Sequence, residues 1–180
     1  MKNIPRVSIV IPAYNEEKII RATVEFALAQ DYPNFEVIVA NNASTDDTAQ
    51  ILDSIKDPHL KVVFESRKGT SFAREAGRLA ATGSIIGLLD ADCAPNKDWI
   101  SKGVQFFNNP DVVAVTGPYN YHDSSDFFRY STLYSQYALM PTINFITRYM
   151  KQGGVLIGGN AFIRADVLAK AGGYDTNLTF

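Results

Sequence analysis

The sequence predicts an α/β fold in which a mostly parallel sheet carries helices on both faces. Short runs rich in Val, Ile and Leu alternate with longer amphipathic segments over the first half of the chain, and this alternation is typical of βαβ units. Polar clusters follow the strand-like runs, at the carboxyl edge where open α/β sheets bind ligands. With 180 residues, 46% of them apolar and 20% charged, the chain fits one globular domain.

The first strand is expected at 6–11, a β-branched run that ends at Pro12 because proline cannot donate to a sheet ladder. A helix at 16–30 follows, with its apolar residues near one face and Asn15 as the expected N-cap. The second strand is expected at 35–40. Right-handed crossovers between such strands place them in one parallel sheet.

The next elements bring the number of expected parallel strands to four. Ser44 is the expected N-cap of a second helix, and the two aspartates just after it would stabilise the positive end of the helix dipole. A strand at 60–65, a helix at 70–81 and a strand at 84–89 come next.

The second half of the chain is less regular. A helix is expected at 99–108 and a strand at 112–116. Further along, we expect a short apolar run at 155–157, a turn at Gly158-Gly159-Asn160 and a helix near 165–171.

The segment 126–150 is rich in Phe, Tyr and Met and is expected to be helical with a break before Pro141. Helical spacing relates five of its large side chains, namely Phe127, Tyr130, Tyr134, Tyr137 and Met140. Such a stripe usually packs against a core or a partner. The alternative is a membrane surface or a lipid-linked acceptor, with three basic residues close by, Arg129, Arg148 and Lys151. The sequence leaves both interpretations open.

Charge and cysteine content exclude several classes of protein. The formal net charge of −2 and the pI near 5.7 give no overall electrostatic basis for binding nucleic acid. Cys93 is the only cysteine, which excludes an internal disulfide. The first residues lack the charged and apolar regions of an export signal, and no uninterrupted apolar run is long enough to span a bilayer. We therefore expect a cytoplasmic protein without a nucleic-acid partner.

Asp90-Ala91-Asp92 directly follows the apolar strand at 84–89, so two carboxylates stand where a buried strand ends. A hard cation such as Mg²⁺ or Mn²⁺ prefers oxygen ligands, and one or two carboxylates suffice when phosphate oxygens and waters complete its shell. A solvated turn is the simpler alternative for this tripeptide taken alone.

Three further polar clusters follow the other expected strands: Pro12-Ala13-Tyr14-Asn15-Glu16-Glu17, Asn41-Asn42-Ala43-Ser44-Thr45-Asp46, and Arg67-Lys68-Gly69 with Arg74. The amides can donate to and accept from a nucleobase edge, and the cations can reach phosphates. Each cluster has a structural alternative, since Asn and Asp favour turns and caps, and Lys68 and Arg74 fit ordinary solvated positions. Four clusters at four successive strand ends favour one shared binding site.

The ordered set of motifs resembles the family 2 inverting glycosyltransferases with a GT-A fold. The resemblance extends through Gly158-Gly159-Asn160 and Gly172-Gly173-Tyr174-Asp175 and covers essentially the whole chain. It implies a Rossmann-like sheet, a nucleotide-diphosphate sugar donor that is commonly UDP-linked, a divalent metal, Mg²⁺ or Mn²⁺, and a glycan or lipid-linked acceptor. It divides a single domain, 1–180, into a nucleotide-binding half, 1–92, and an incomplete acceptor-side half, 93–180.

The resemblance also implies roles for individual residues. The nucleotide would be bound by Pro12, Ala13, Tyr14, Glu16, Asn42, Gly69, Arg74, Asp90 and Ala91. The metal would be held by Asp92 and approached by Asp90, and a cation there stabilises the charge that builds on the leaving diphosphate. Three residues would lie near the donor sugar and the acceptor, namely Gly158, Gly159 and Asn160.

Three departures from the family pattern limit these implications. Asn41 and Asn42 stand where the family often has Asp, which changes the polarity offered to the base, and Cys93 replaces an often acidic residue. Inversion requires a general base on the acceptor hydroxyl, and in the family this is the Asp of a Glu-Asp pair beyond the Gly-Gly-Tyr-Asp segment. The sequence stops at Phe180, and Asp175 is expected to be a turn residue.

The resemblance therefore implies a metal-dependent, inverting sugar transferase domain in which Asp92 assists departure of the diphosphate, in a chain without the expected general base. The alternatives are a non-catalytic nucleotide-sugar binding module, or a truncated and inactive form of the enzyme. A nucleotidyltransferase is a weaker alternative, because the chain has no Gly-rich, basic first loop to hold a triphosphate. Truncation would expose apolar surface, from which we expect self-association.

Overall fold

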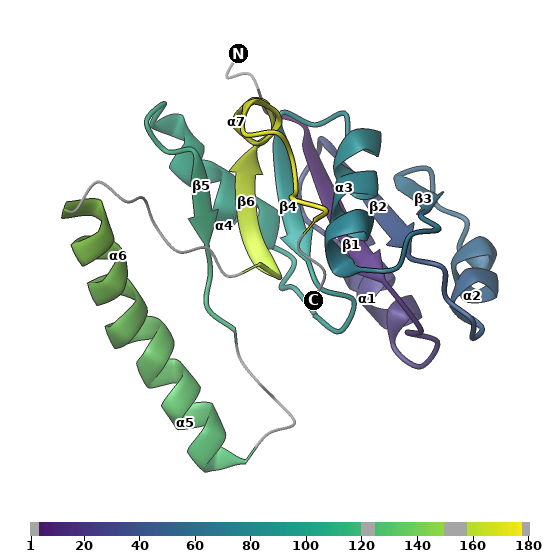
Figure 1. Cartoon of the computed structure of the whole chain (residues 1–180), viewed down its shortest axis with the longest axis horizontal. Coiled ribbons are helices and arrows are strands. Elements are labelled where there is room, and N and C mark those ends of the chain that lie inside the picture. The colour runs from purple at the N-terminus through teal and green to yellow at the C-terminus, as the bar shows by residue number, and fades with distance from the viewer. Residues whose placement is uncertain (1–3, 120–124, 150–157, 178–180) are drawn as a thin grey trace.

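A six-stranded sheet in the order β3-β2-β1-β4-β6-β5 forms the centre of the molecule (Figure 1). The structure is a computed structural model that describes residues 4–119, 125–149 and 158–177. The strands are β1 (Val7–Ala13), β2 (Phe35–Asn41), β3 (Leu60–Phe64), β4 (Ile85–Leu89), β5 (Ala114–Thr116) and β6 (Asn160–Arg164). The helices are α1 (Ile20–Leu28), α2 (Thr48–Ser54), α3 (Thr70–Ala80), α4 (Trp99–Val104), α5 (Asp126–Tyr134), α6 (Met140–Tyr149) and α7 (Ala165–Lys170).

The first four strands run parallel, as the sequence predicts, with Val7 of β1 aligned to Phe35 of β2 and to Ile85 of β4. Strands β1, β2 and β4 are almost entirely buried, as parallel strands covered on both faces must be. The α/β class with a mostly parallel sheet is confirmed.

Strand β6 was not expected from the sequence. It pairs antiparallel with both β4 and β5, and it begins at Asn160, so only Gly158 and Gly159 of the expected turn are in a turn. The apolar run expected at 155–157 lies outside the described residues. Five residues with a polar side chain at each end give too little alternation for the strand to be recognised in the sequence.

Pro12 does not end the first strand, contrary to the prediction. The carbonyl of Ala13 accepts from the Asn42 amide at 2.8 Å, so the polar groups of Ala13 face β2 and those of Pro12 face the other side. Pairing with β4 on that side has already ended at Val10. Proline therefore costs no ladder hydrogen bond at this position.

Helices α1 and α2 both begin later than predicted, because the loops before them bind each other. Asn15 is not an N-cap; its backbone has a positive φ of 56° and its side chain accepts from the Thr45 amide at 2.8 Å. Ser44 is not a cap either, since its hydroxyl accepts from the Asn15 amide at 3.1 Å. Asp46 instead accepts from the Thr48 amide at the start of α2. These bonds hold two of the predicted site loops together.

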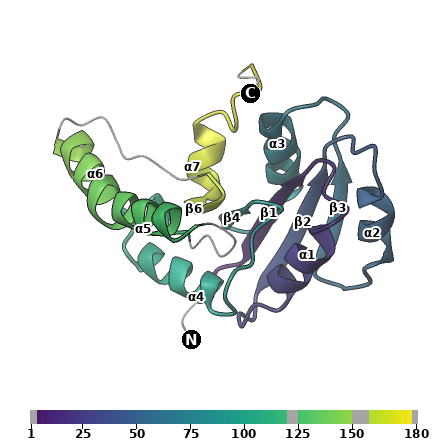
Figure 2. The same cartoon turned by 90° about the horizontal axis from the view of Figure 1, so that it is seen from below.

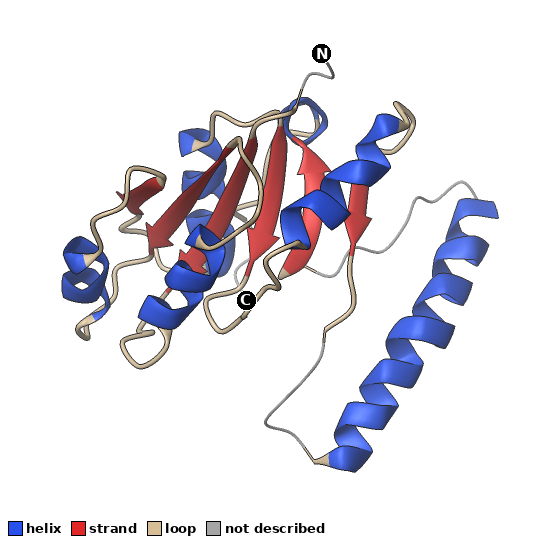
Figure 3. Cartoon of the chain, turned by 180° about the vertical axis from the view of Figure 1, so that it is seen from behind, coloured by secondary structure: helices blue, strands red, loops and turns tan. Residues whose placement is uncertain are grey.

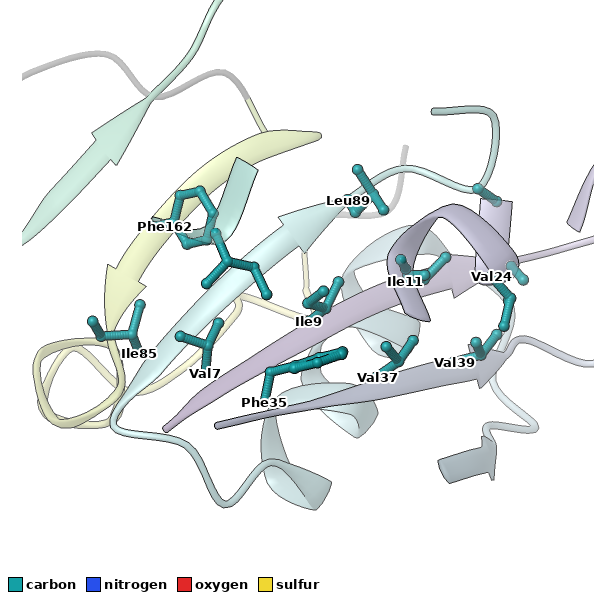
Figure 4. Close-up of a cluster of buried hydrophobic side chains, with 14 of the residues drawn as sticks. Val7, Ile9, Ile11, Val24, Phe35, Val37, Val39, Ile85, Leu89 and Phe162 are labelled. Atoms are coloured by element: carbon teal, nitrogen blue, oxygen red, sulfur yellow. The ribbon is translucent and has the colours of Figure 1, made fainter. Parts of the chain in front are cut away.

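Two apolar clusters fill the spaces between the sheet and its helices. Figure 2 shows α3 and α7 on one face of the sheet and α1 and α4 on the other. The larger cluster lies under α1 and α4 and includes Ile9, Val24, Val37 and Phe162 (Figure 4). Helix α4 continues as a 3₁₀ turn, Gln105–Asn108. The core thus fixes the strand ends at which the predicted site residues stand.

Helices α5 and α6 form one rod that stands apart from the sheet (Figure 3). Contrary to the prediction, the helix does not break before Pro141. It passes through a π-helical segment, Ser135–Leu139, just ahead of the proline. Such a segment rearranges the backbone bonds that a proline would otherwise disrupt. None of the helices among the described residues is both long and apolar enough to cross a membrane.

Glu36 should make the fold sensitive to acid. Burial favours its neutral form, but hydrogen bonds from Ser8, Thr82 and Arg6 outweigh burial and lower its pKa to about 2 from 4.5. A carboxylate with a lowered pKa stabilises the fold fully above pH 4.5, and this contribution is lost as the pH falls toward about 2.

We expect Glu36→Gln to lower the free energy of unfolding near neutral pH by about 2 kcal/mol and to flatten its decline in acid. Urea titrations across this range measure both effects. Because Glu36 lies at the amino edge of the sheet, nucleotide binding should be retained. An unchanged acid dependence in the variant would contradict the assignment.

Candidate functional site

A cavity of about 250 Å³ opens at the carboxyl edge of β1, β2 and β4. Its lining comes from four segments that are far apart in sequence: Pro12, Ala13, Tyr14, Glu16, Asn42, Thr70, Ala73, Asp90, Ala91 and Asp92. Of the residues predicted to bind nucleotide, Gly69 and Arg74 are absent from this lining. Thr70 and Ala73 were not predicted, although their i, i+3 spacing on the helix after Gly69 could have indicated a shared face.

Arg74 binds the first carboxylate of the Asp-Ala-Asp turn. Its Nη2 lies 3.1 Å from Oδ1 of Asp90, and both side chains are partly exposed. The backbone of Gly159 covers the same carboxylate, since a Cβ there would overlap Asp90 and the hydroxyl of Tyr119. A Cβ at Gly158 would approach the Arg74 guanidinium at 3.3 Å. The structure thus brings both glycines of the predicted sugar site onto the Arg74–Asp90 pair.

The turn itself is fixed by hydrogen bonds from outside it. The hydroxyl of Thr23 on α1 donates to the carbonyl of Ala91 at 2.6 Å, and the Cys93 amide donates to the carbonyl of Asp90 at 3.2 Å. Both bonds hold the backbone so that Asp92, which is exposed, lines the cavity.

Asp92 is the carboxylate best placed to hold a divalent cation. Among the described residues, its side chain accepts only a weak hydrogen bond from the Cys93 thiol at 3.7 Å, whereas Asp90 is already paired with Arg74. No group of three potential metal-binding side chains occurs within the described ranges. One carboxylate still fits Mg²⁺ or Mn²⁺ when phosphates supply the other ligands. The residues therefore fit a metal that binds together with a diphosphate.

Negative charge accumulates around the cavity. Partial burial raises the pKa of Glu16, and the nearby carboxylates of Asp92 and Asp46 raise it further. Burial likewise raises the pKa of the Cys93 thiol to about 12, with Asp92 and Asp90 adding to the effect. A diphosphate that enters this cavity requires cationic compensation.

Asn42 lines the cavity, but its side chain is committed to the loop after β3. Its Nδ2 donates to the carbonyls of Glu65 and Arg67 at 3.2 and 2.6 Å, and its Oδ1 accepts from the Gly69 amide at 2.8 Å. Both amide protons are therefore used. The neighbouring Asn41 is buried and accepts from the Ser44 amide. These amides position loops, as the structural alternative for this cluster predicts.

Arg67 is also committed within the protein. It forms two side-chain hydrogen bonds of 2.9 Å with Glu65, which lower the pKa of that carboxyl to about 2, and its guanidinium lies 4.5 Å from the centroid of the Phe72 ring. Lys68 instead donates to the hydroxyl of Tyr14 at 3.2 Å. In the Arg67-Lys68-Gly69 cluster, Lys68 is the residue whose side chain contacts a residue of the cavity, whereas Arg67 and Gly69 contact Asn42 through their backbones.

The predicted residues of the later motifs are not part of the cavity lining. Asn160 accepts from the indole of Trp99 at 2.7 Å and donates to the carbonyl of Pro118 at 3.0 Å. Tyr174 follows two glycines with positive φ, and its amide donates to Glu75 of α3 at 3.1 Å. Asp175 accepts from the Asn177 amide at 2.9 Å, as expected for a turn residue.

Comparison with known proteins agrees with this arrangement of strand-end motifs. The model of the family described as Glycosyl transferase family 2 matches residues 8–172. The chain belongs to glycosyltransferase family 2. The family 2 match begins in β1 and extends to the glycines ahead of Tyr174, so it includes every predicted site residue.

Two relatives and one solved structure show the extent of the similarity. Probable glycosyltransferase YdaM of Bacillus subtilis is 31% identical over 97% of this chain and 44% of its own length. The Escherichia coli UDP-Glc:alpha-D-GlcNAc-diphosphoundecaprenol beta-1,3-glucosyltransferase WfaP is 38% identical over 67% of this chain and 48% of its own.

The mannosyltransferase PcManGT of Pyrobaculum calidifontis, solved with GDP-Man and Mn²⁺, superposes with a TM-score of 0.75 at 27% identity. That match covers 98% of this chain and 49% of PcManGT. The family 2 chain described here thus spans about half the length of these three proteins, and its GT-A fold is shown.

Proposed function

We propose that this chain binds the donor of a metal-dependent, inverting glycosyltransferase, and that the donor is a UDP-linked sugar. The observation that carries the proposal is the cavity in which residues from four strand-end segments meet beside Asp92. PcManGT is solved with GDP-Man, which supports a nucleotide-sugar donor for this family member, and the name of WfaP includes UDP-Glc, which supports the UDP-linked form.

The charges around the cavity give the proposal its physical basis. Glu16, Asp90 and Asp92 line the cavity, and within the part of the chain that the structure describes only Asp90 is paired with a cation. Asp92 would hold Mg²⁺ or Mn²⁺ jointly with the diphosphate, and a metal bound there supplies Lewis-acid stabilisation of the leaving group. Arg74 keeps the Asp90 carboxylate in place under Gly159. The protein thus contributes fixed carboxylates for the cation that a bound diphosphate requires.

Inversion requires the acceptor hydroxyl to attack from the face opposite the leaving group. Asp92 lies on the leaving-group side in this proposal and so cannot be the base. Asp175 is occupied in its turn. The base therefore has to be a different carboxylate, and nucleotide-sugar binding without transfer is the alternative activity for the chain.

A transfer assay tests the proposed reaction. UDP release from UDP-sugars should depend on Mn²⁺ or Mg²⁺, and the product linkage should have the anomeric configuration opposite to that of the donor. Retained configuration would reject the inverting mechanism. Metal-dependent donor binding without product would select the binding-only alternative.

We propose further that the acceptor is lipid-linked and that the α5–α6 rod rests on the cytoplasmic surface of a membrane. The rod exposes a stripe of large side chains, with exposed fractions of 85% for Phe127, 63% for Tyr130, 72% for Tyr134 and 66% for Tyr137. Amphipathic aromatic rings suit the interface between water and lipid. The acid on α5, Asp126, is paired with Arg129 at 3.0 Å, so it adds little repulsion from anionic lipid.

Vesicle flotation tests the membrane surface. With vesicles of phosphatidylglycerol and phosphatidylcholine at low salt, we expect the protein to float and the double variant Phe127→Ser, Tyr134→Ser to stay behind. Phe26→Ser on α1, 47% exposed at the parent residue, is the matched control and should float. If the wild-type protein does not float with the vesicles but dimerises through the rod, the stripe binds a second copy of the chain and the membrane proposal is wrong.

A further inference from the structure

The three cations that follow β3 differ in how their charges are compensated. Arg67 and Arg74 each pair with a carboxylate, at 2.9 and 3.1 Å. No ion pair of Lys68 occurs among the described residues; its ammonium donates to the neutral hydroxyl of Tyr14 at 3.2 Å and lies 5.2 Å from the ring centroid. Lys68 therefore keeps an uncompensated positive charge.

That charge stands at the rim of the cavity. Tyr14 is part of the cavity lining and is 45% exposed, so the ammonium that binds its hydroxyl lies next to the open space. The hydroxyl of Tyr14 is a weak competitor for the ammonium compared with an anionic oxygen, because the hydroxyl is neutral and an anionic oxygen adds the attraction between opposite charges. A ligand oxygen can therefore take over the ammonium.

The backbone on both sides of Lys68 is held in place. The carbonyl of Arg67 and the amide of Gly69 both bind the Asn42 side chain, at 2.6 and 2.8 Å. Lys68 thus projects from a fixed position, and little backbone freedom is lost when a ligand binds. Both N–H donors of the Asn42 side chain are used in this loop, on the carbonyls of Glu65 and Arg67.

We propose that Lys68 is a nucleotide-binding residue whose ammonium leaves the Tyr14 hydroxyl and donates to an oxygen of the bound nucleotide. The inference rests on the proposed function and extends it, because Lys68 has no role in that proposal. Lys68 supplies the side-chain donor that Asn42 lacks.

Calorimetric titration of the full chain with UDP in the presence of Mn²⁺ tests the inference. Lys68→Met removes the charge and keeps most of the stem, and we expect it to weaken binding by about 10- to 100-fold. Lys68→Arg should restore part of the affinity. Lys56→Met makes the same change in net charge at a lysine that binds the Asp53 carbonyl after α2, and it should bind like the wild type.

Parallel titrations with uridine identify the oxygen. An equal loss for uridine and UDP in Lys68→Met places the ammonium on the base or ribose, and a loss for UDP alone places it on a phosphate; either result supports the inference. Equal affinity of Lys68→Met and Lys56→Met, with both folded by thermal melting, overturns this inference and leaves the proposed function intact. A wild-type protein that binds no nucleotide overturns both.

Discussion

Asp92→Asn should abolish the metal dependence of nucleotide binding and weaken UDP affinity in Mn²⁺ by about 100-fold or more. Loss of groups that only support a metal ligand already costs about 10- to 100-fold, and Asp92 is an exposed carboxylate of the cavity that accepts a weak hydrogen bond from Cys93. The amide is nearly the same size, so the turn should stay intact. Calorimetry with and without Mn²⁺ measures the effect.

Asp111→Asn is the matched control for this substitution. Asp111 is exposed and precedes β5, so the substitution removes one carboxylate that is not part of the cavity lining. It should bind UDP with wild-type affinity and wild-type metal dependence. If Mn²⁺ tightened UDP binding to Asp92→Asn as much as it does for the wild type, the metal would be held by another residue.

Gly159→Ala should damage the site and the fold together. The new methyl group would overlap the Asp90 carboxylate and the Tyr119 hydroxyl, and Gly159 is buried where β6 begins. Relief requires Asp90 to move away from Arg74. We expect a loss of about 1–3 kcal/mol in the free energy of unfolding and a fall in UDP affinity of at least about tenfold.

Gly158→Ala is the graded comparison. Its methyl group would meet only the end of the Arg74 side chain, at 3.3 Å, and a flexible side chain can yield by a few tenths of an ångström. Thermal melting should therefore rank wild type, Gly158→Ala and Gly159→Ala in falling order. The reverse order of the two variants would contradict the close approach of Gly159 to Asp90.

The sequence predicts the sheet well because its signals are local. Strands β1, β2 and β4 are buried and largely apolar runs, and the polar residues after them have to meet at one edge. The starts of α1 and α2 were predicted wrongly, because Asn15 and Ser44 bind each other's loops instead of capping their own helices. Such bonds join residues about 30 positions apart, and a propensity argument does not include them.

The residues that gather at the site were predictable from the sequence, whereas the contacts that each of them makes were not. Asn42 and Arg67 have suitable donors for a base and a phosphate, yet the structure uses them to build the loop after β3. The same loop presents Lys68 to Tyr14. Sequence identifies which groups gather at a strand end; only the contacts show which of them are left for a ligand.

The most direct test of the donor site is a calorimetric titration of the wild-type chain with UDP, with and without Mn²⁺. We expect binding with one nucleotide per chain that is at least about tenfold tighter in Mn²⁺. Folded protein that binds neither UDP nor GDP, or that binds them equally with and without the metal, would contradict a metal-dependent donor site at Asp92.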